Sequence, residues 1–124
     1  MNKSNLNTKN KIPKSVVEVK DLKVQFQLKD KVVKAVDGIS FNINKGGCED
    51  SLNIVKSTGD INKIDISNAY SDALDLDFSD LNLYHLNISK AGNDCLDVSG
   101  GNYYINKLTV DSCADKGVSI GEKS

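Results

Sequence analysis

Two sets of regularly spaced aspartates are the residues of this chain whose types and spacing could support chemistry. One set is Asp50, Asp72 and Asp94, the other is Asp75 and Asp97, and the spacing between successive members is the same in both sets. Residues that recur at the length of a structural repeat lie side by side, and stacked strands are about 4.8 Å apart. Because carboxylates at that distance disfavour joint ionisation, they need a cation, a shared proton or screening by water.

Three interpretations of these carboxylates stay open on the sequence alone. Aspartates at chain bends commonly cap backbone amides, which is a structural role. Clustered carboxylates also suit calcium, the one cofactor that the sequence suggests. Two carboxylates that flank a glycosidic bond can instead hydrolyse it by acid–base chemistry. We therefore take Asp72, Asp75, Asp94 and Asp97 as candidate ligand or calcium residues, and Asp72 with Asp94 as a hypothetical catalytic pair.

A repeat of about 22 residues positions these side chains. Apolar residues recur in four series, namely Leu52, Leu74, Leu96 and Val118; Ile54, Leu76, Val98 and Ile120; Ile64, Leu86 and Leu108; and Ile66, Ile88 and Val110. Short alternating segments cannot bury a face alone, so successive turns must stack and share an interior. The pattern predicts an all-β chain in which 47–124 form a right-handed parallel β-helix of about three and a half coils.

The first third of the chain has a different character. Residues 1–15 are polar and are expected to form a disordered leader, whereas 16–46 contain four short alternating segments that predict an antiparallel β meander. Residues 1–46 carry 10 Lys and 4 acidic side chains, a net charge of +6, so 47–124 carry −7 within the total of −1. This change of sign marks a boundary near Gly46–Gly47. The meander is expected to cover the first coil as a cap.

The segment "VVEVKDLKVQFQLKDKVVKAVDGISFNINKG", residues 16–46, resembles the N-terminus of ABC transporter ATPases of the oligopeptide-importer type. That resemblance implies that Phe26 stacks on adenine. The phosphate loop G-x-x-x-x-G-K-[ST], which the family places next, is replaced here by the acidic stretch "GCEDSLNIVK". Nucleotide binding through Phe26 is therefore a third functional hypothesis, and ATP hydrolysis is not expected.

The motifs "YSDALD", "NDCLDVSGG" and "DKGVSIGE" resemble successive coils of polygalacturonase-type glycoside hydrolases. The resemblance implies that Asp72 and Asp94 activate water. The general-acid position holds Asn93, which cannot donate a carboxyl proton, and the histidine position holds Lys116. Right-handed β-helix repeat proteins that contain "DCLD-SGG" are a closer likeness, and we regard them as bacterial surface or polysaccharide-associated modules.

The cysteines favour no further site. Cys48, Cys95 and Cys113 have no C-x-x-C spacing and no neighbouring histidine, so neither a zinc site nor a disulfide framework is expected. Cys95 and Cys113 recur with small residues and are interpreted as buried thiols.

Other side chains are assigned to the outer surface. His85 shares a series with Lys63 and Lys107, which predicts a solvated row. Tyr84 and Tyr104 are expected to point outward, where sugar rings could stack on them.

The leading functional prediction is a non-enzymatic β-helix module that binds polysaccharide or calcium, joined to an incomplete ATPase-like start as a chimera or fragment. The alternative is a remnant carbohydrate hydrolase or lyase that uses the same carboxylates. Dispersed lysines without Arg argue against nucleic acid, and no apolar run suits a membrane span or signal peptide. Uncapped coils predict end-to-end self-association. The β-helix half is of an extracellular type and the N-terminal half of a cytoplasmic type, so the location stays open.

Overall fold

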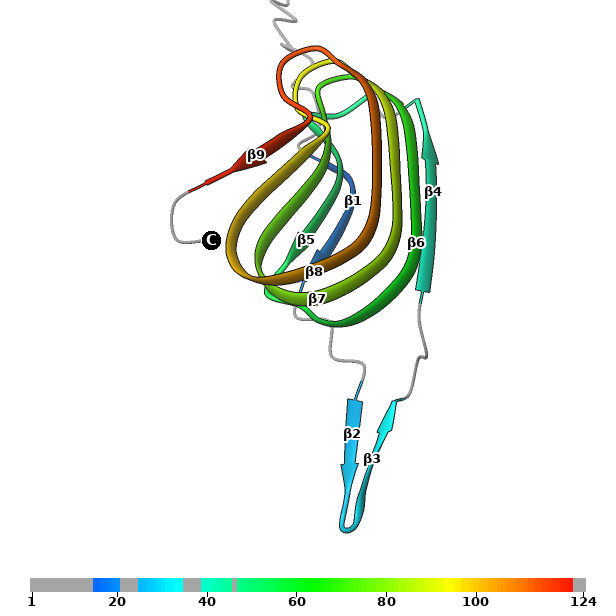
Figure 1. The fold of residues 1–124 in the computed structure, drawn as a ribbon, viewed down its shortest axis with the longest axis vertical. Helices are drawn as coiled ribbons and strands as arrows, with labels where there is room; N and C mark the ends of the chain where they lie inside the picture. The colour runs from blue at the N-terminus through cyan, green and yellow to red at the C-terminus, as the bar shows by residue number, and fades with distance from the viewer. Residues whose placement is uncertain (1–14, 21–24, 35–38, 46, 122–124) are drawn as a thin grey trace, which may run out of the picture.

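The computed structural model describes residues 15–20, 25–34, 39–45 and 47–121, and the regular elements among them are all β-strands (Figure 1). In chain order they are β1 (Ser15–Lys20), β2 (Gln25–Leu28), β3 (Lys31–Lys34), β4 (Ile39–Asn44), β5 (Asp50–Val55), β6 (Thr58–Ala69), β7 (Asp72–Ala91), β8 (Leu96–Cys113) and β9 (Val118–Ile120). The predicted all-β class is confirmed. These described ranges contain no helix long and apolar enough to cross a membrane.

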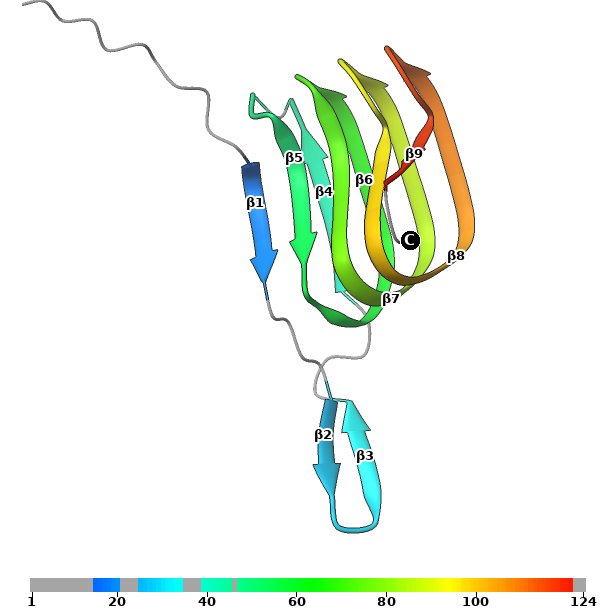
Figure 2. The same cartoon turned by 90° about the vertical axis from the view of Figure 1, so that its left-hand side faces the viewer.

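The strands wind into stacked parallel coils (Figures 1 and 2). β5 and β6 pair in parallel with the first and second parts of β7, and β7 pairs in parallel with β8 along almost its whole length. The register places Leu52 beside Leu74, Leu74 beside Leu96 and Leu96 beside Val118, which is the spacing that the sequence repeat predicts. The parallel β-helix is therefore confirmed.

The N-terminal strands add a coil that the sequence did not predict. β1 pairs in parallel with β5 and β4 pairs in parallel with β6, so the expected antiparallel pairing holds for β2 and β3 only. Val17, Phe41 and Ile43 are half-buried and pack against the core, which explains why these alternating segments lie on the coils. The β2–β3 hairpin projects from this coil (Figure 2). The expected leader, 1–15, lies outside the described residues except for Ser15, which begins β1.

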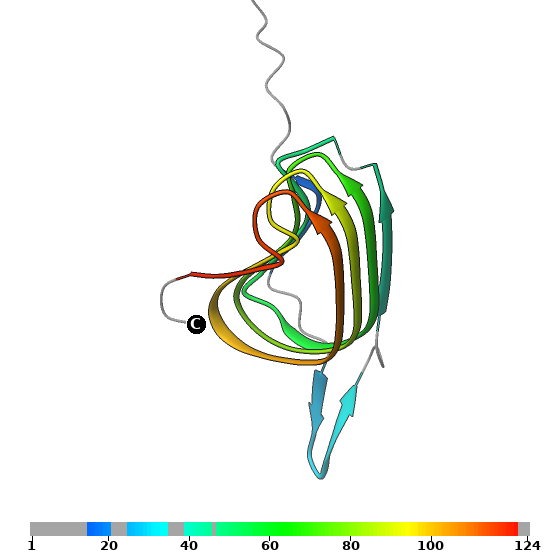
Figure 3. The ribbon, with the colours of Figure 1, turned by 45° about the horizontal axis from the view of Figure 1, so that its top comes forward.

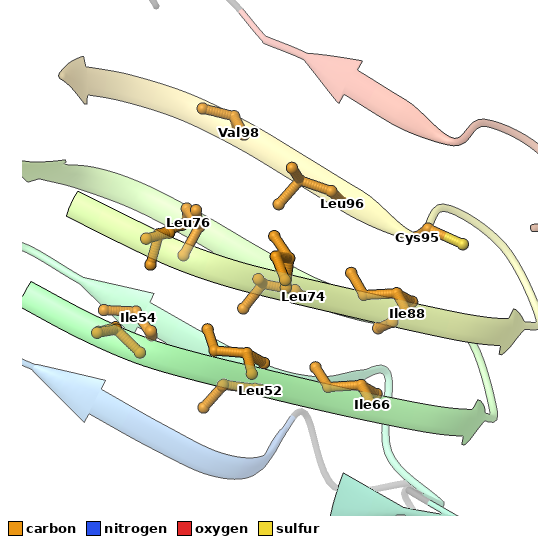
Figure 4. Packing of buried hydrophobic residues seen from close by; sticks show 14 of the residues in the cluster. Leu52, Ile54, Ile66, Leu74, Leu76, Ile88, Cys95, Leu96 and Val98 are labelled. Atoms are coloured by element: carbon orange, nitrogen blue, oxygen red, sulfur yellow. The ribbon is translucent and has the colours of Figure 1, made fainter. Parts of the chain in front are cut away.

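Apolar side chains from successive coils fill the interior (Figure 4). Leu52, Leu74 and Leu96 are at most 1% exposed, and they stack one above the other. Burial of a leucine side chain stabilises a fold by about 1.5–3 kcal/mol. Because a single coil cannot bury such a side chain alone, this stabilisation depends on the neighbouring coils.

Each coil bends between its straighter segments (Figure 3). Residues in the left-handed conformation stand at these bends. Two series share this conformation, with φ between 48° and 60°: Lys56, Phe78 and Gly100 in one bend, and Asn68, Lys90 and Ser112 in the other. Gly101 follows at φ 89°, and a Cβ atom there would clash with the Ser79 carbonyl oxygen of the coil before. Glycine therefore allows the close approach of two backbones at this bend.

Candidate functional site

Asp72 and Asp94 lie at the same bend of successive coils, and each binds the backbone of the coil that follows. Asp72 Oδ1 accepts hydrogen bonds from the Asp94 backbone N at 3.0 Å and from Asn93 Nδ2 at 2.8 Å. One coil later, Asp94 Oδ1 accepts a hydrogen bond from the Lys116 backbone N at 2.9 Å, and Lys116 Nζ lies 3.7 Å from Asp94 Oδ2. The residues of the hypothetical catalytic pair thus have the contacts of bend-capping aspartates.

Asp75 and Asp97 form a second pair, in register on β7 and β8. Asp75 is half-buried, and burial followed by repulsion from nearby carboxylates raises its pKa to about 7. Those carboxylates, in order of effect, are Asp77, Asp50, Asp97 and Asp72. Near neutral pH the Asp75 carboxyl therefore exists in both its protonated and its ionised form, beside other carboxylates.

This pair differs from three other carboxylates that face the next coil. In those three columns the next coil supplies an asparagine whose Nδ2 donates to the carboxylate at 2.7–2.8 Å, as Asn82 does to Asp60, Asn87 to Asp65, and Asn102 to Asp80. The Asp75 column instead runs from Asn53 through Asp75 to Asp97. Asn53 is 3% exposed, and its Oδ1 has no hydrogen-bond partner among the described residues. The carboxylate of Asp75 thus lacks the asparagine bond that Asp60, Asp65 and Asp80 accept.

Calcium binding by Asp72, Asp75, Asp94 and Asp97 stays a prediction. In the described parts of the chain, no group of three or more His, Cys, Asp or Glu side chains is arranged to hold a metal ion. The capping bonds of Asp72 and Asp94 already engage one oxygen of each. Of the four predicted ligands, Asp75 and Asp97 are therefore the two whose oxygens are not engaged by such capping bonds and could face a cation.

A polar groove on the outer face of β4, β6, β7 and β8 is a site that the sequence did not reveal. Its volume is about 310 Å³, and its polar lining residues are Asn42, Asp65, Ser67, Asn87, Ser89, Thr109 and Asp111. These residues form two columns along the coil axis, Asn42–Asp65–Asn87–Thr109 and Ser67–Ser89–Asp111. The sequence does contain a signal for this groove. The residues that recur at these positions vary in type, but all of them are polar.

The centre of the groove is neutralised by its own contacts. Asp65 Oδ1 accepts a hydrogen bond from Asn87 Nδ2 at 2.8 Å, and Lys63 Nζ lies 2.6 Å from Asp65 Oδ2. The Asn87 bond and then the Lys63 contact lower the pKa of the Asp65 carboxyl. Asp65 is therefore ionised at neutral pH and paired, so it does not repel an anionic ligand as a bare carboxylate would.

The remaining sequence predictions fall in separate places. Lys63, His85 and Lys107 form the predicted row beside the groove, and all three are exposed. Tyr84 and Tyr104 are also exposed, as expected, at 40% and 61%.

Phe26 lies on the β2–β3 hairpin. It pairs with Val33 on the backbone, and its side chain lies outside the described residues.

The prediction for the cysteines was wrong. Cys95 and Cys113 form a disulfide bond with a Cα–Cα distance of 5.5 Å, whereas Cys48 is a buried free thiol. The reason lies in the coil geometry: Cys113 stacks on Ala91, which precedes Cys95 by one short bend. The sequence separation of the two cysteines, 18, is slightly less than one repeat, which brings Cys113 next to Cys95 across that bend. The sequence thus contained the signal, which was their spacing relative to the repeat.

No protein-family model, curated protein or solved structure matches the chain. A functional conclusion therefore rests on the fold and on the contacts described above.

Proposed function

We propose that this chain is a non-enzymatic parallel β-helix module that binds an extended carbohydrate along its coils. The observation that supports the proposal best is the polar groove of about 310 Å³, whose lining stays polar from coil to coil although the residue types vary. Amides, hydroxyls and carboxylates are the groups that recognise sugar hydroxyls, and here they are already in columns. The ligand would lie along the coil axis, across the strands.

The repeat of the groove matches a repeating ligand. Equivalent side chains on neighbouring strands are about 4.8 Å apart, which is close to the length of one pyranose unit in an extended chain. Ser67 and Ser89 then offer the same hydroxyl contact to successive sugar units, and Asn87 with Thr109 offers a second set. Lys107 borders this face, and its charge would favour a polysaccharide that carries uronic acids.

Substitution of one asparagine tests the proposal. Asn87→Ala removes a groove amide, and loss of one or two hydrogen bonds should weaken binding about 5- to 20-fold. Asn82→Ala is the matched control, because Asn82 makes the same kind of bond to Asp60 away from the groove. Calorimetric titration of neutral and uronic-acid polysaccharides against the wild type and both variants gives the measurement. Equal affinities for the two variants would place the carbohydrate elsewhere, and binding of no polysaccharide by the wild type would refute the function.

A second candidate function is glycoside hydrolysis or elimination at the Asp75 column. The observation that favours it is a carboxyl group whose pKa is raised to about 7 beside other carboxylates, which is how an acid and a base come to coexist at neutral pH. On this proposal Asp75 donates the proton and Asp97 is the base. Release of reducing ends from a polysaccharide, abolished by Asp75→Asn with no loss of folding, is the expected result. Absence of release by the wild type between pH 5 and 8 would leave the module non-enzymatic.

The likeness of 16–46 to an ATPase start supports only a weaker proposal, namely that the hairpin bearing Phe26 contacts a nucleotide base. A fluorescent ATP analogue tests it, and Phe26→Ala is the variant that should abolish any binding. The same likeness underlies the proposal that the chain joins two unrelated pieces.

A further inference from the structure

The Asp75 column contains a buried polar atom without a partner. Asn53 lies on β5 between Leu52 and Ile54, which belong to the core (Figure 4), so its side chain is on the outer face of the strand. It is nevertheless only 3% exposed, and its Oδ1 has no hydrogen-bond partner in the described part of the chain. Because a buried acceptor without a donor destabilises a fold, a bound ligand at Asn53 Oδ1 would be favourable.

Carboxylates lie beside this atom on the next coils. Asn53 is in register with Asp75 on β7, and Asp75 is in register with Asp97 on β8. The carboxylates whose charge acts on that of Asp75 are Asp77, Asp50, Asp97 and Asp72. The column therefore combines a buried amide oxygen with negative charge, and this combination favours a cation over an anion or a neutral ligand.

We propose that calcium binds between Asn53 Oδ1 and the carboxylate of Asp75, with Asp97 adding its charge from the next coil. Side chains in register on neighbouring strands are about 4.8 Å apart, so an ion midway between two of their oxygens lies about 2.4 Å from each. Calcium–oxygen distances are about 2.3–2.6 Å, whereas magnesium requires about 2.0–2.1 Å. Calcium takes about six to eight oxygens, and water can supply the others because Asp75 is only half-buried.

A bridging water molecule would satisfy the same two oxygens but would not reduce the negative charge. Water can donate one hydrogen bond to Asn53 Oδ1 and one to Asp75. It would leave the repulsion between Asp75 and Asp97 unchanged, whereas a divalent cation offsets that repulsion. The site has two carboxylates and one amide, so it differs from the groups of three or more His, Cys, Asp or Glu side chains that the described ranges lack.

The calcium site is separate from the polar groove. Asn53, Asp75 and Asp97 belong to β5 and to the first parts of β7 and β8, whereas the groove lies on β4, β6 and the later parts of β7 and β8. Figure 1 shows β5 and β6 on different sides of the coil. Calcium binding is therefore independent of the carbohydrate proposal, and either one can fail without the other. An ion here would occupy the carboxyl group that the second candidate function uses as an acid, so those two are alternatives.

Calorimetric titration of the full chain with calcium chloride tests the site. The wild type should bind calcium with a dissociation constant of about 0.1–1 mM, the weak end of the range for protein calcium sites. Asn53→Leu keeps the size of the side chain and removes the oxygen, so it should bind calcium at least about 10-fold more weakly. Because this variant also removes the unpartnered acceptor, its melting temperature in the presence of a chelator should not fall below that of the wild type.

A pair of charge variants separates a defined site from general attraction to an acidic surface. Asp75→Asn removes the carboxylate ligand and should also weaken calcium binding at least about 10-fold. Asp80→Asn is the matched control, because it removes one negative charge from the same strand outside the column, where Asn102 already donates to the carboxylate. This control should bind calcium as the wild type does.

The side-chain amide signal of Asn53 in a nitrogen–proton NMR spectrum supplies the second measurement. It should shift as calcium is added, and it should shift less with magnesium. A wild type that binds no calcium at about 10 mM, ten times the upper limit of the expected range, overturns the proposal. So does an Asn53→Leu variant that binds as the wild type does, or equal weakening by Asp75→Asn and Asp80→Asn. If Asn53→Leu does not fold, the Asn53 signal and the two aspartate variants still decide the question.

Discussion

Reduction of the Cys95–Cys113 disulfide should destabilise the last coil and, through it, the whole helix. The bond closes a loop with a sequence separation of 18 residues. In the chain-entropy model a loop of this length stabilises the folded state by about 3 kcal/mol. For a domain near 100 residues, a change of that size lowers the melting temperature by about 10–20 °C.

The effect should begin locally. The disulfide joins the bend before β8 to the last residue of β8, a strand whose outer side is paired only along Leu96–Val98, with β9. Without it, β8 has only β7 to hold it along 101–113. Amide exchange followed by mass spectrometry should therefore accelerate in 101–113 under reducing conditions before it accelerates in β7.

The assay needs a background without the third thiol. Cys48→Ala removes the buried free cysteine and with it disulfide exchange, and the melting temperature is then measured with and without a phosphine reductant. The double variant Cys95→Ala and Cys113→Ala is the control, because it should melt at the lower temperature under both conditions. Before reduction, denatured wild-type protein should offer one thiol to a labelling reagent, and after reduction three. Three thiols before reduction, or a melting temperature unmoved by the reductant, would refute the reasoning.

Three further predictions follow from the site and the fold. The pKa of Asp75 is raised to about 7 in the folded chain, from 3.8, so the folded chain holds this proton more tightly than the unfolded chain does. The contribution of Asp75 to the stability of the fold is therefore fully present below pH 4 and is lost as the pH rises through 7. In Asp75→Asn the loss of unfolding free energy with pH should be smaller by about 1–2 kcal/mol, after allowance for solvent screening of a half-exposed group. Urea unfolding of the wild type and the variant at pH 5 and pH 8 measures this loss. The same change in unfolding free energy between the two pH values for both proteins would contradict the prediction. Calcium at 100 times its dissociation constant should stabilise the wild type by about 2.7 kcal/mol if the Asp75–Asp97 pair binds it, and thermal melts should show no such gain for Asp75→Asn with Asp97→Asn. Removal of 1–46 uncovers the edges of β5 and β6 and should lower the melting temperature of the remaining coils, whereas an unchanged value would mean that β1 and β4 are not a cap.

The sequence predicts the coils well wherever the repeat is uninterrupted. From Leu52 to Val118 each strand pairs with the next at the same offset, so residues that recur at the repeat length in the sequence form a column in space. The first coil breaks that rule. The offset from Val17 to its partner Leu52 is much longer than the repeat because the β2–β3 hairpin is inserted, and the offset from Phe41 to its partner Ile64 is slightly longer than the repeat. Changed offsets hide β1 and β4 from a search at one period, which is why they were predicted to form a meander.

The candidate site was predicted less completely, because the register fixes which residues lie side by side but not the direction in which each side chain points. The repeat predicted that Asp72 and Asp94 stack, but their Oδ1 atoms turn to the backbone of the next coil. The groove was missed because its columns mix residue types, with Ser67 and Ser89 followed by Asp111. Only a structure shows that such a mixed column shares one outward face.

The Asp75–Asp97 pair, which lacks the asparagine bond of the other columns, bears on function more than those columns do. A coil needs no carboxylate at both Asp75 and Asp97, because an asparagine at either place would provide the amide bond that Asn87 gives to Asp65. Burial of Asp75, and then repulsion from the carboxylates around it, instead raises its pKa to about 7 and leaves repulsion in the folded state. Departures from local stability concentrate at functional sites in natural proteins. The Asp75 column is therefore the place where we propose an acid–base role, or a cation that takes the place of the missing amide.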